Sequence, residues 1–272
     1  WEPSELTQLN ERLEKGETVP VKPDLAGLIR RSTALYLESE RLFNPVIGKR
    51  LKAWGFQRHD PNEPLPAPTA MLTPVPAMTD LQWLDNDQLT SINPEVSLDL
   101  GGVAKGYALN ALLADYRRYG IQRAMINLGG DIGVLGALPD RPWRIGILGG
   151  DGQEPIAALV LYDGEMAFSS GTYARKHDIG NGKSAHHIID PRTGNPAEGN
   201  LATTVVGTDG ERLQAASKVL LIAGEDWRRL SRRMNIDQAL VVRSDGVIEI
   251  TSALAARLEP IGTESDNWHI IP

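Results

Sequence analysis

The stretch VSLDLGGVAKGYALNALLADYRRYG, residues 96–120, decides the fold class, because it places a glycine turn between two kinds of secondary structure. Its first residues predict a strand, and the residues after the glycines predict a helix. Gly120 suits the position just after the helix end, where a left-handed backbone is favoured. The helix carries an apolar stripe on one face, formed by Leu109, Leu112, Leu113 and Tyr116.

The sequence before this stretch predicts helices. Ser4 is a candidate N-cap for a helix over Glu5–Arg12. Asp24 is a candidate cap for a second helix, which Asn44-Pro45 is expected to end. The segment VIGKRLKAWGF, residues 46–56, predicts a short amphipathic piece, and the proline-rich residues 60–78 predict a surface connector.

The sequence after this stretch predicts mainly strands. Residues 123–136 and 143–150 indicate strands interrupted by glycine. Residues 156–171 and 238–251 indicate hairpins, with Asp163-Gly164 and Asp245-Gly246 as their turns. A further strand over 202–209 precedes a helix over 211–224. We therefore expect an α+β protein with a mixed, largely antiparallel sheet and helices packed on it.

The composition excludes several classes of function. The 272 residues carry a net charge of −7 without a long basic run, which argues against a nucleic-acid partner. No apolar stretch approaches the roughly 20 residues that span a bilayer. Cysteine is absent, so disulfides, thiolate metal sites and cysteine nucleophiles are excluded. Because the chain begins at Trp1 without Met, we expect an N-terminal piece to precede it.

Two glycine pairs are candidate sites. In DLGGVAKG, residues 99–106, the glycines and the following helix N-terminus favour a phosphate, and Lys105 adds a positive charge. The alternative is a tight turn with an exposed lysine. In NLGGD, residues 127–131, Asp131 either presents a carboxylate at a sheet edge or caps a β-bulge.

The third candidate site combines SSGTYAR, residues 169–175, with HHIIDPRTG, residues 186–194. Either of the adjacent residues His186 and His187 could be a general base, or both could be structural. On a strand they would point to opposite faces, so only one is expected to enter a site. Asp190 is expected to fix the turn into the following proline. The ligand spacing does not suit zinc.

Together these segments resemble the ApbE-type flavin transferases, which are FAD:protein FMN transferases once described as thiamine-biosynthesis lipoproteins. Five ordered motifs over nearly the whole chain carry the resemblance: SELTQLN, FNPVIGKRLKAWGF, LDLGGVAKGYALN, INLGGDI and SSGTYAR…HHIIDPRTGNP. The resemblance implies a single domain over residues 1–272 with an ApbE-like, T-fold-related architecture and an FAD site in a cleft.

The resemblance also implies an activity and its residues. The family transfers FMN from FAD to a threonine hydroxyl of a target protein, typically a subunit of a membrane redox complex, and releases AMP. By position His187 would be catalytic, and Ile188 would line the flavin pocket. The other residues expected to contact FAD are Asn10, Trp54, Gly55, Phe56, Asp99 and Lys105.

At the positions of the family's magnesium ligands, this chain departs from the family's sequence pattern. The resemblance places the metal ligands at the carbonyl of Gly102 and on the helix segment LQAASK, residues 213–218. The family's Asp and Thr fall on Gln214 and Lys218, while Ser217 is retained. Mg²⁺ usually takes at least one carboxylate, so the ligand set is degraded. We expect the Lys218 ammonium to stand where Mg²⁺ would be and to pair with the FAD phosphates.

Three functions stay open at this point: an FMN transferase with an unusual metal requirement, an FAD-binding relative that transfers weakly or not at all, and an accessory partner of a membrane redox complex that acts by binding. A further departure from the family pattern is Asn110, which stands where the family has an Asp after A-K-G.

Family resemblance also predicts a location at the periplasmic or extracytoplasmic face of the inner membrane, with anchoring through the missing N-terminus.

Overall fold

The computed structural model describes residues 4–57, 74–180, 183–262 and 268–272. The chain forms two compact units, of which unit 1 comprises residues 1–100 and 178–196, and unit 2 comprises residues 101–177 and 197–272. The description of 1–272 as a single family domain stays a prediction. Of the expected connector over 60–78, residues 60–73 lie outside the described residues, and the rest lead into the 3-10 helix η2, Met78–Asp80.

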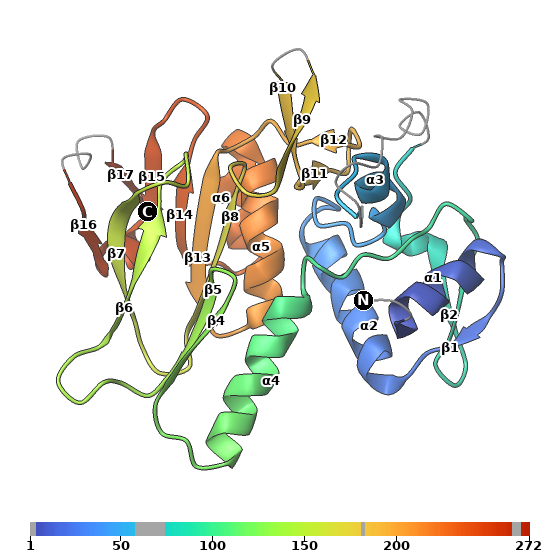
Figure 1. The fold of residues 1–272 in the computed structure, drawn as a ribbon, viewed down its shortest axis with the longest axis horizontal. Coiled ribbons are helices and arrows are strands. Elements are labelled where there is room, and N and C mark those ends of the chain that lie inside the picture. Colours follow the sequence, from blue (N-terminus) through green and yellow to red (C-terminus); the bar gives the residue numbers. More distant parts are fainter. Residues whose placement is uncertain (1–3, 58–73, 181–182, 263–267) are drawn as a thin grey trace. The chain divides into compact units, whose positions relative to one another are not determined.

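Unit 1 combines short helices with small β-structures (Figure 1). Helix α1 spans Glu5–Glu14 and begins at Ser4, whose hydroxyl accepts a hydrogen bond from Thr7 N, so the predicted N-cap is confirmed. The remaining elements are α2 (Pro23–Glu38), α3 (Gly48–Ala53), an antiparallel sheet of β1 (Val19–Pro20), β3 (Gln88–Ser91) and β2 (Leu81–Leu84), and the hairpin of β11 (Ile189–Asp190) and β12 (Asn195–Pro196).

Helix α2 differs from its prediction at both ends. Its N-cap is Lys22, which makes no side-chain cap, and Asp24 lies inside the first turn, where a carboxylate favours the helix dipole. The helix ends at Glu38 rather than at residues 44–45. Its end is set by the left-handed backbone of Glu40 and Arg41, with φ of 54° and 72°, because an α-helix cannot continue through that conformation.

Unit 2 is built on a seven-stranded sheet in the order β17-β15-β14-β13-β8-β5-β4 (Figure 1). All neighbouring strands are antiparallel except β15 and β17, so the predicted largely antiparallel sheet is confirmed. The strands are β4 (Ala124–Leu128), β5 (Asp131–Leu135), β8 (Met166–Gly171), β13 (Ala202–Gly207), β14 (Gln238–Val242), β15 (Ile248–Thr251) and β17 (Trp268–Ile271).

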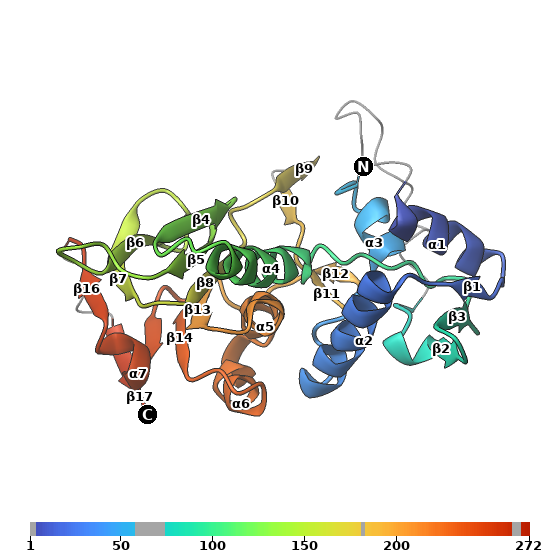
Figure 2. The ribbon, with the colours of Figure 1, turned by 90° about the horizontal axis from the view of Figure 1, so that it is seen from below.

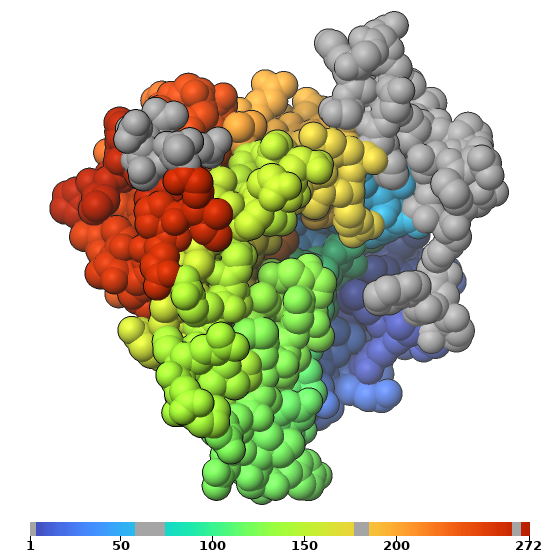
Figure 3. Space-filling view, turned by 60° about the vertical axis from the view of Figure 1, so that its left-hand side comes forward, coloured from blue at the N-terminus to red at the C-terminus, as the bar shows by residue number. Residues whose placement is uncertain are grey.

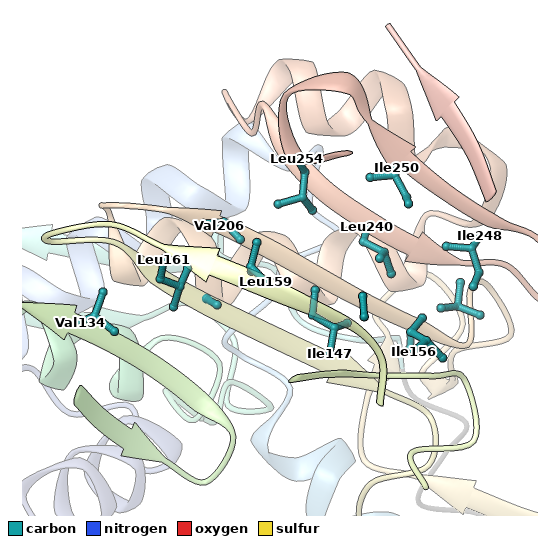
Figure 4. Close-up of a cluster of buried hydrophobic side chains, with 14 residues drawn as sticks. Val134, Ile147, Ile156, Leu159, Leu161, Val206, Leu240, Ile248, Ile250 and Leu254 are labelled. Atoms are coloured by element: carbon teal, nitrogen blue, oxygen red, sulfur yellow. The ribbon is translucent and has the colours of Figure 1, made fainter. Parts of the chain in front are cut away.

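A second, three-stranded sheet packs on one face of the large sheet. It has the order β16-β7-β6, with β6 at Trp143–Leu148, β7 at Pro155–Leu161 and β16 at Leu258–Pro260. A buried apolar cluster joins both sheets, and Figure 4 shows Ile147 and Leu159 facing Val206 and Leu240 across it. Leu254 of the short helix α7, Ser252–Ala255, closes one end of this cluster.

Helices cover the opposite face of the large sheet (Figure 2). Helix α4, Ala104–Arg118, packs on β5, and α5, Gly210–Ile222, packs on β8 and β13. Because side chains alternate along a strand, Val206 of β13 faces the apolar cluster while Thr203 faces α5. The face of α4 that points away from the sheet is exposed to solvent, as the green segment of the space-filling view shows (Figure 3). Helix α6, Trp227–Arg233, packs against α5.

Two local predictions about strands are wrong. Residues 156–171 turn at Asp163-Gly164 as expected, but β7 and β8 do not pair, because the turn carries the chain from the small sheet to the large one. The residues before the Gly101–Gly102 turn form no strand, although the helix after the turn is confirmed. The hairpin of β14 and β15 around Asp245-Gly246 is confirmed.

Candidate functional site

In unit 1 the segment Trp54-Gly55-Phe56 ends helix α3. Gly55 has a φ of 78°, and its N–H donates to the carbonyl of Lys52 at 2.9 Å. Phe56 N donates to the carbonyl of Leu51 at 2.9 Å, which completes a Schellman motif. Glycine is therefore needed here by the backbone, and the motif fixes the two aromatic residues on either side of it.

These aromatic residues lie beside the histidine segment. Trp54 Nε1 donates to the carbonyl of Gly194 at 2.9 Å, in the turn between β11 and β12. The rings of Phe56 and His187 meet edge to face with centroids 6.3 Å apart. Phe56 also packs with Ile189 in a small buried cluster. The predicted flavin residues of this segment are thus brought together in one place within unit 1.

The two histidines have different surroundings. His186 is 8% exposed, and its Nδ1 accepts a hydrogen bond from Ile188 N at 3.3 Å. His187 is half-buried, so it is the better placed of the two for proton transfer to a ligand. Ile188 itself is buried, at 4% exposed.

Asp190 fixes the turn that follows, as the sequence predicted. Its carboxylate accepts hydrogen bonds from Arg192 N at 2.8 Å and from the Arg192 guanidinium, whose Nη2 lies 2.7 Å away. Both the backbone and the guanidinium of Arg192 are thereby fixed to the Asp190 carboxylate. Asp190 is committed to the backbone and to this ion pair, which leaves His187 as the base candidate of the segment.

Asn10 and Asp99 hold the other side of unit 1 together. The Asn10 side-chain amide makes two hydrogen bonds to the backbone of Leu98, one donated to its carbonyl at 2.9 Å and one accepted from its N–H at 2.8 Å. The carboxylate of Asp99 accepts a hydrogen bond from Gln57 Nε2 at 2.7 Å. Asn10 therefore sets the path of the chain into Asp99, which lies two residues before Gly101 of the glycine turn.

In unit 2 the glycine turn leads into α4, which crosses α5 at two glycines. A Cβ on Gly106 would overlap the carbonyl of Gly210, and a Cβ on Gly210 would lie 2.5 Å from the carbonyl oxygen of Gly106. Only glycine at both positions allows this approach of the two backbones. Asn110 supports the crossing, because its side chain donates to Glu211 at 2.6 Å and accepts from Gly210 N at 3.1 Å.

Gln214 lies fully buried at this crossing, at 0% exposed. Its Oε1 accepts a hydrogen bond from Gly106 N at 2.8 Å, and its Nε2 donates to the carbonyl of Gly101 at 2.8 Å. The amide thus links the glycine turn to the first turn of α4. One side chain satisfies a helix N-terminal N–H and a loop carbonyl, which would otherwise lack partners in α4.

The two other predicted metal positions point back to the same residue. Ser217 Oγ lies 3.0 Å from the Gln214 carbonyl oxygen and 2.9 Å from Ser170 Oγ. Lys218 Nζ donates to the Gln214 carbonyl at 3.0 Å. Hydrogen bonds therefore join Gln214, Ser217 and Lys218 on α5, and Gln214 also bonds to Gly101 of the glycine turn, while their assignment to a metal site stays a prediction.

Lys105 lies in the first turn of α4 and forms an ion pair with Asp131. The Asp131 side chain is 5% exposed and that of Lys105 is 44% exposed. The paired carboxylate accounts for a cation at a helix N-terminus, where the dipole disfavours one. Gly129 and Gly130, with φ of 65° and 92°, form a two-residue hairpin turn, so neither a bulge nor an edge position for Asp131 is correct.

The predicted site residues divide between the two units. Unit 1 holds Asn10, Trp54, Gly55, Phe56, Asp99, His187 and Ile188, and unit 2 holds Gly102, Lys105, Gln214, Ser217 and Lys218. Sequence reasoning did not foresee the Lys105–Asp131 pair, although a cation in a first helical turn was a signal for a nearby anion. It also missed that Asn10 and Gln214 use their amides to fix backbone.

The residues at the predicted magnesium positions do not fit Mg²⁺. Both polar atoms of the Gln214 amide are hydrogen-bonded to backbone, and Lys218 brings a positive charge. Among the described residues, no group of three or more His, Cys, Asp or Glu could hold a metal ion. Hard divalent cations need oxygen ligands that are free to point at them.

Comparisons with known proteins match one family over most of the chain. A sequence model of the ApbE family matches residues 1–240. The chain is 38% identical over 265 residues to an FAD:protein FMN transferase of Rhodobacter capsulatus, covering 96% of this chain and 50% of that protein. It is 30% identical over 254 residues to one of Klebsiella pneumoniae, covering 89% and 76%. The chain thus spans half the length of the Rhodobacter relative.

The fold agrees with a solved structure as well. The crystal structure of the ApbE protein of Thermotoga maritima matches with a TM-score of 0.85 and 28% identity, covering 94% of this chain and 84% of that one. The predicted α+β, ApbE-like architecture is confirmed by this match.

Proposed function

Since the chain belongs to the ApbE family, we propose that it transfers the FMN moiety of FAD to a threonine hydroxyl of an acceptor protein and releases AMP. The observation that carries the proposal is the match of one family over most of the chain, with the transferase name shared by its relatives. The acceptor we propose is a subunit of a membrane redox complex.

The residues of unit 1 suit the flavin part of FAD. The partly buried Trp54 gives aromatic surface beside the buried Phe56, whose ring contacts His187, and such surface binds a flat ring system. Asp99 and Asn10 shape the backbone that leads to the glycine turn.

The residues of unit 2 suit the phosphates. The glycine turn before α4 lets backbone approach a pyrophosphate, and the half-exposed Lys105 supplies positive charge. Asp131 holds that ammonium in place before FAD binds. Charge neutralisation on phosphate and correct positioning are the main contributions a protein makes to phosphoryl transfer.

In the proposed reaction, the threonine oxygen attacks the phosphorus of the FMN half of FAD. A new O–P bond forms, the pyrophosphate P–O bond breaks, and the electron pair leaves with AMP. His187 is the proposed base that takes the threonine proton. The residues at the family's magnesium positions do not fit Mg²⁺, so positive charge on the phosphates comes from lysine side chains in this proposal.

Transfer is tested by mixing the protein with FAD and an acceptor peptide that contains the threonine, then recording flavin fluorescence of the peptide after denaturing electrophoresis. Flavin fluorescence on the threonine peptide supports transfer, provided that the fluorescence is absent from a control peptide in which alanine replaces the threonine. His187→Ala should lower the rate by about 100-fold or more. Bound FAD without a labelled peptide would contradict transfer.

A second candidate is an FAD-binding relative without transfer activity. The altered positions Gln214 and Lys218 favour it, because the expected carboxylate is missing. An accessory protein would bind a redox complex without binding FAD. The same experiment separates them, since FAD that stays bound and unmodified indicates the carrier, and no FAD binding indicates the accessory protein.

For location we propose the extracytoplasmic face of the inner membrane, with anchoring to that membrane. None of the helices in the described ranges is both long and apolar enough to cross a bilayer. Fractionation of cells that express the full-length protein tests the proposed location.

A further inference from the structure

The feature that carries this inference is the way Gln214 is bonded. Its oxygen and its nitrogen each lie 2.8 Å from a backbone partner, Gly106 N and the Gly101 carbonyl, respectively. The side chain is fully buried, and α4 and α5 are in backbone contact beside it. This amide therefore cannot turn toward a cation without giving up its bond to the Gly101 carbonyl and leaving the N–H of Gly106, a buried residue, without its partner.

An aspartate at position 214 could not make the same pair of bonds. A carboxylate only accepts hydrogen bonds, so it could bond to Gly106 N but would repel the Gly101 carbonyl. A cation between that carboxylate and that carbonyl would be needed to relieve the repulsion. The glutamine amide, with a donor and an acceptor, removes the need for the cation.

Lys218 adds the charge that the amide lacks. Its ammonium donates to the Gln214 carbonyl at 3.0 Å, so it folds back along α5 toward the turn that carries the amide. Lys218 is half-buried. It lies one helical turn after Gln214, whose side-chain amide bonds to the glycine turn. Ser217 keeps this turn in place through Ser170.

We propose that Gln214 and Lys218 together replace the divalent cation, so that the protein binds FAD without a metal. Gln214 holds the glycine turn and α4 in the geometry for the pyrophosphate. Lys218 supplies positive charge to the phosphates, in addition to Lys105. The inference rests on the proposed function, because it assumes that FAD is the ligand of this site.

The test is an FAD titration, followed by quenching of flavin fluorescence, in EDTA and in excess Mg²⁺. The wild-type dissociation constant should agree within about twofold between the two buffers, since the residues that the structure describes offer no ligand set for the ion. Tighter binding by about tenfold or more in Mg²⁺ would overturn the inference. Calorimetry with Mg²⁺ alone should show no binding to the protein.

Two variants sharpen the test. Lys218→Met keeps most of the side-chain length and should weaken FAD binding in EDTA by about tenfold or more, as expected for a lost hydrogen bond to a charged group. Lys15→Met removes an exposed lysine of unit 1 and should leave the constant unchanged. Unchanged affinity in Lys218→Met would contradict the role of Lys218.

The double variant Gln214→Asp with Lys218→Thr restores the family residues. It should bind FAD weakly in EDTA and at least about tenfold more tightly in Mg²⁺, with a binding signal for Mg²⁺ itself. If it folds but stays insensitive to Mg²⁺, the replacement is not explained by these two residues and the inference fails. If wild-type protein binds no FAD in either buffer, the proposed function fails instead.

Discussion

The side-chain oxygen of Gln214 lies 2.8 Å from the backbone nitrogen of Gly106, and this hydrogen bond joins residues 108 positions apart in the sequence. It ties the N-terminal turn of α4 to the middle of α5. With the second bond to Gly101, it makes one amide the internal support of the glycine turn.

Replacing Gln214 by alanine should destabilise the fold. The N–H of Gly106, a buried residue, would lose its partner, so we expect the free energy of unfolding to fall by about 1–3 kcal/mol. Urea unfolding of the purified protein measures the change. Gln8→Ala, at an exposed position of α1, is the control and should change the free energy by less than about 0.5 kcal/mol. Equal effects of the two variants would contradict the support role.

Gly106→Ala should also be destabilising, because the added methyl group would overlap the carbonyl of Gly210. Overpacking of this kind usually lowers the free energy of unfolding by about 1–3 kcal/mol. In α2, Gly27 is exposed with nothing within 4 Å of an added Cβ, so Gly27→Ala should stabilise by about 0.5–1 kcal/mol. Thermal melts of both variants check the opposite signs.

Lys105→Met should weaken FAD binding by about tenfold or more, if Lys105 faces the phosphates as proposed. The variant also leaves the Asp131 carboxylate, which is 5% exposed, without its ammonium, so some loss of stability is expected. The variant Lys105→Met with Asp131→Asn removes both charges and should regain stability without regaining affinity. Recovery of affinity in the double variant would show that Lys105 only compensates Asp131.

The stability of unit 2 should fall in acid through Glu249. Burial by itself would raise the pKa of this carboxyl, but hydrogen bonds from Arg228 and Trp227 outweigh it and hold the pKa below its usual range. A lowered pKa contributes stability above about pH 4.3, the ordinary glutamate value, and this stability is lost as pH falls through the folded-state pKa.

Urea unfolding between about pH 7 and pH 3 tests the Glu249 prediction. Glu249→Gln should lower the free energy of unfolding at neutral pH by about 1–3 kcal/mol and should flatten its decline in acid. The curves of variant and wild type would then converge at low pH. Parallel curves would show that other carboxyl groups cause the acid sensitivity.

Local signals in the sequence predicted much of this molecule. The Ser4 cap, the helix after Gly102 and the Asp245-Gly246 hairpin depend on neighbouring residues, and all three are confirmed. The separation of β7 from β8 was not predictable in this way, because a turn residue does not tell which sheet receives the next strand. The end of α2 was missed because no glycine or proline marks it.

The candidate site shows the same division. Motifs placed the residues of the glycine turn and of the 213–218 helix segment in one cluster, and the structure brings them together. Which atoms bond to which was not visible, because a glutamine in a helix is compatible with solvent, metal or backbone. Its partners at Gly101 and Gly106 are more than 100 residues away in the sequence.

The close approach of Gly106 and Gly210 is made by backbone atoms and does not involve the side chains at positions 214 and 218. Substitutions at positions 214 and 218 alone could then replace a bound metal ion by a side-chain amide and an ammonium group within the same fold. A protein whose own ammonium group neutralises the FAD phosphates keeps its affinity for FAD when chelators or competing ions lower the concentration of free Mg²⁺.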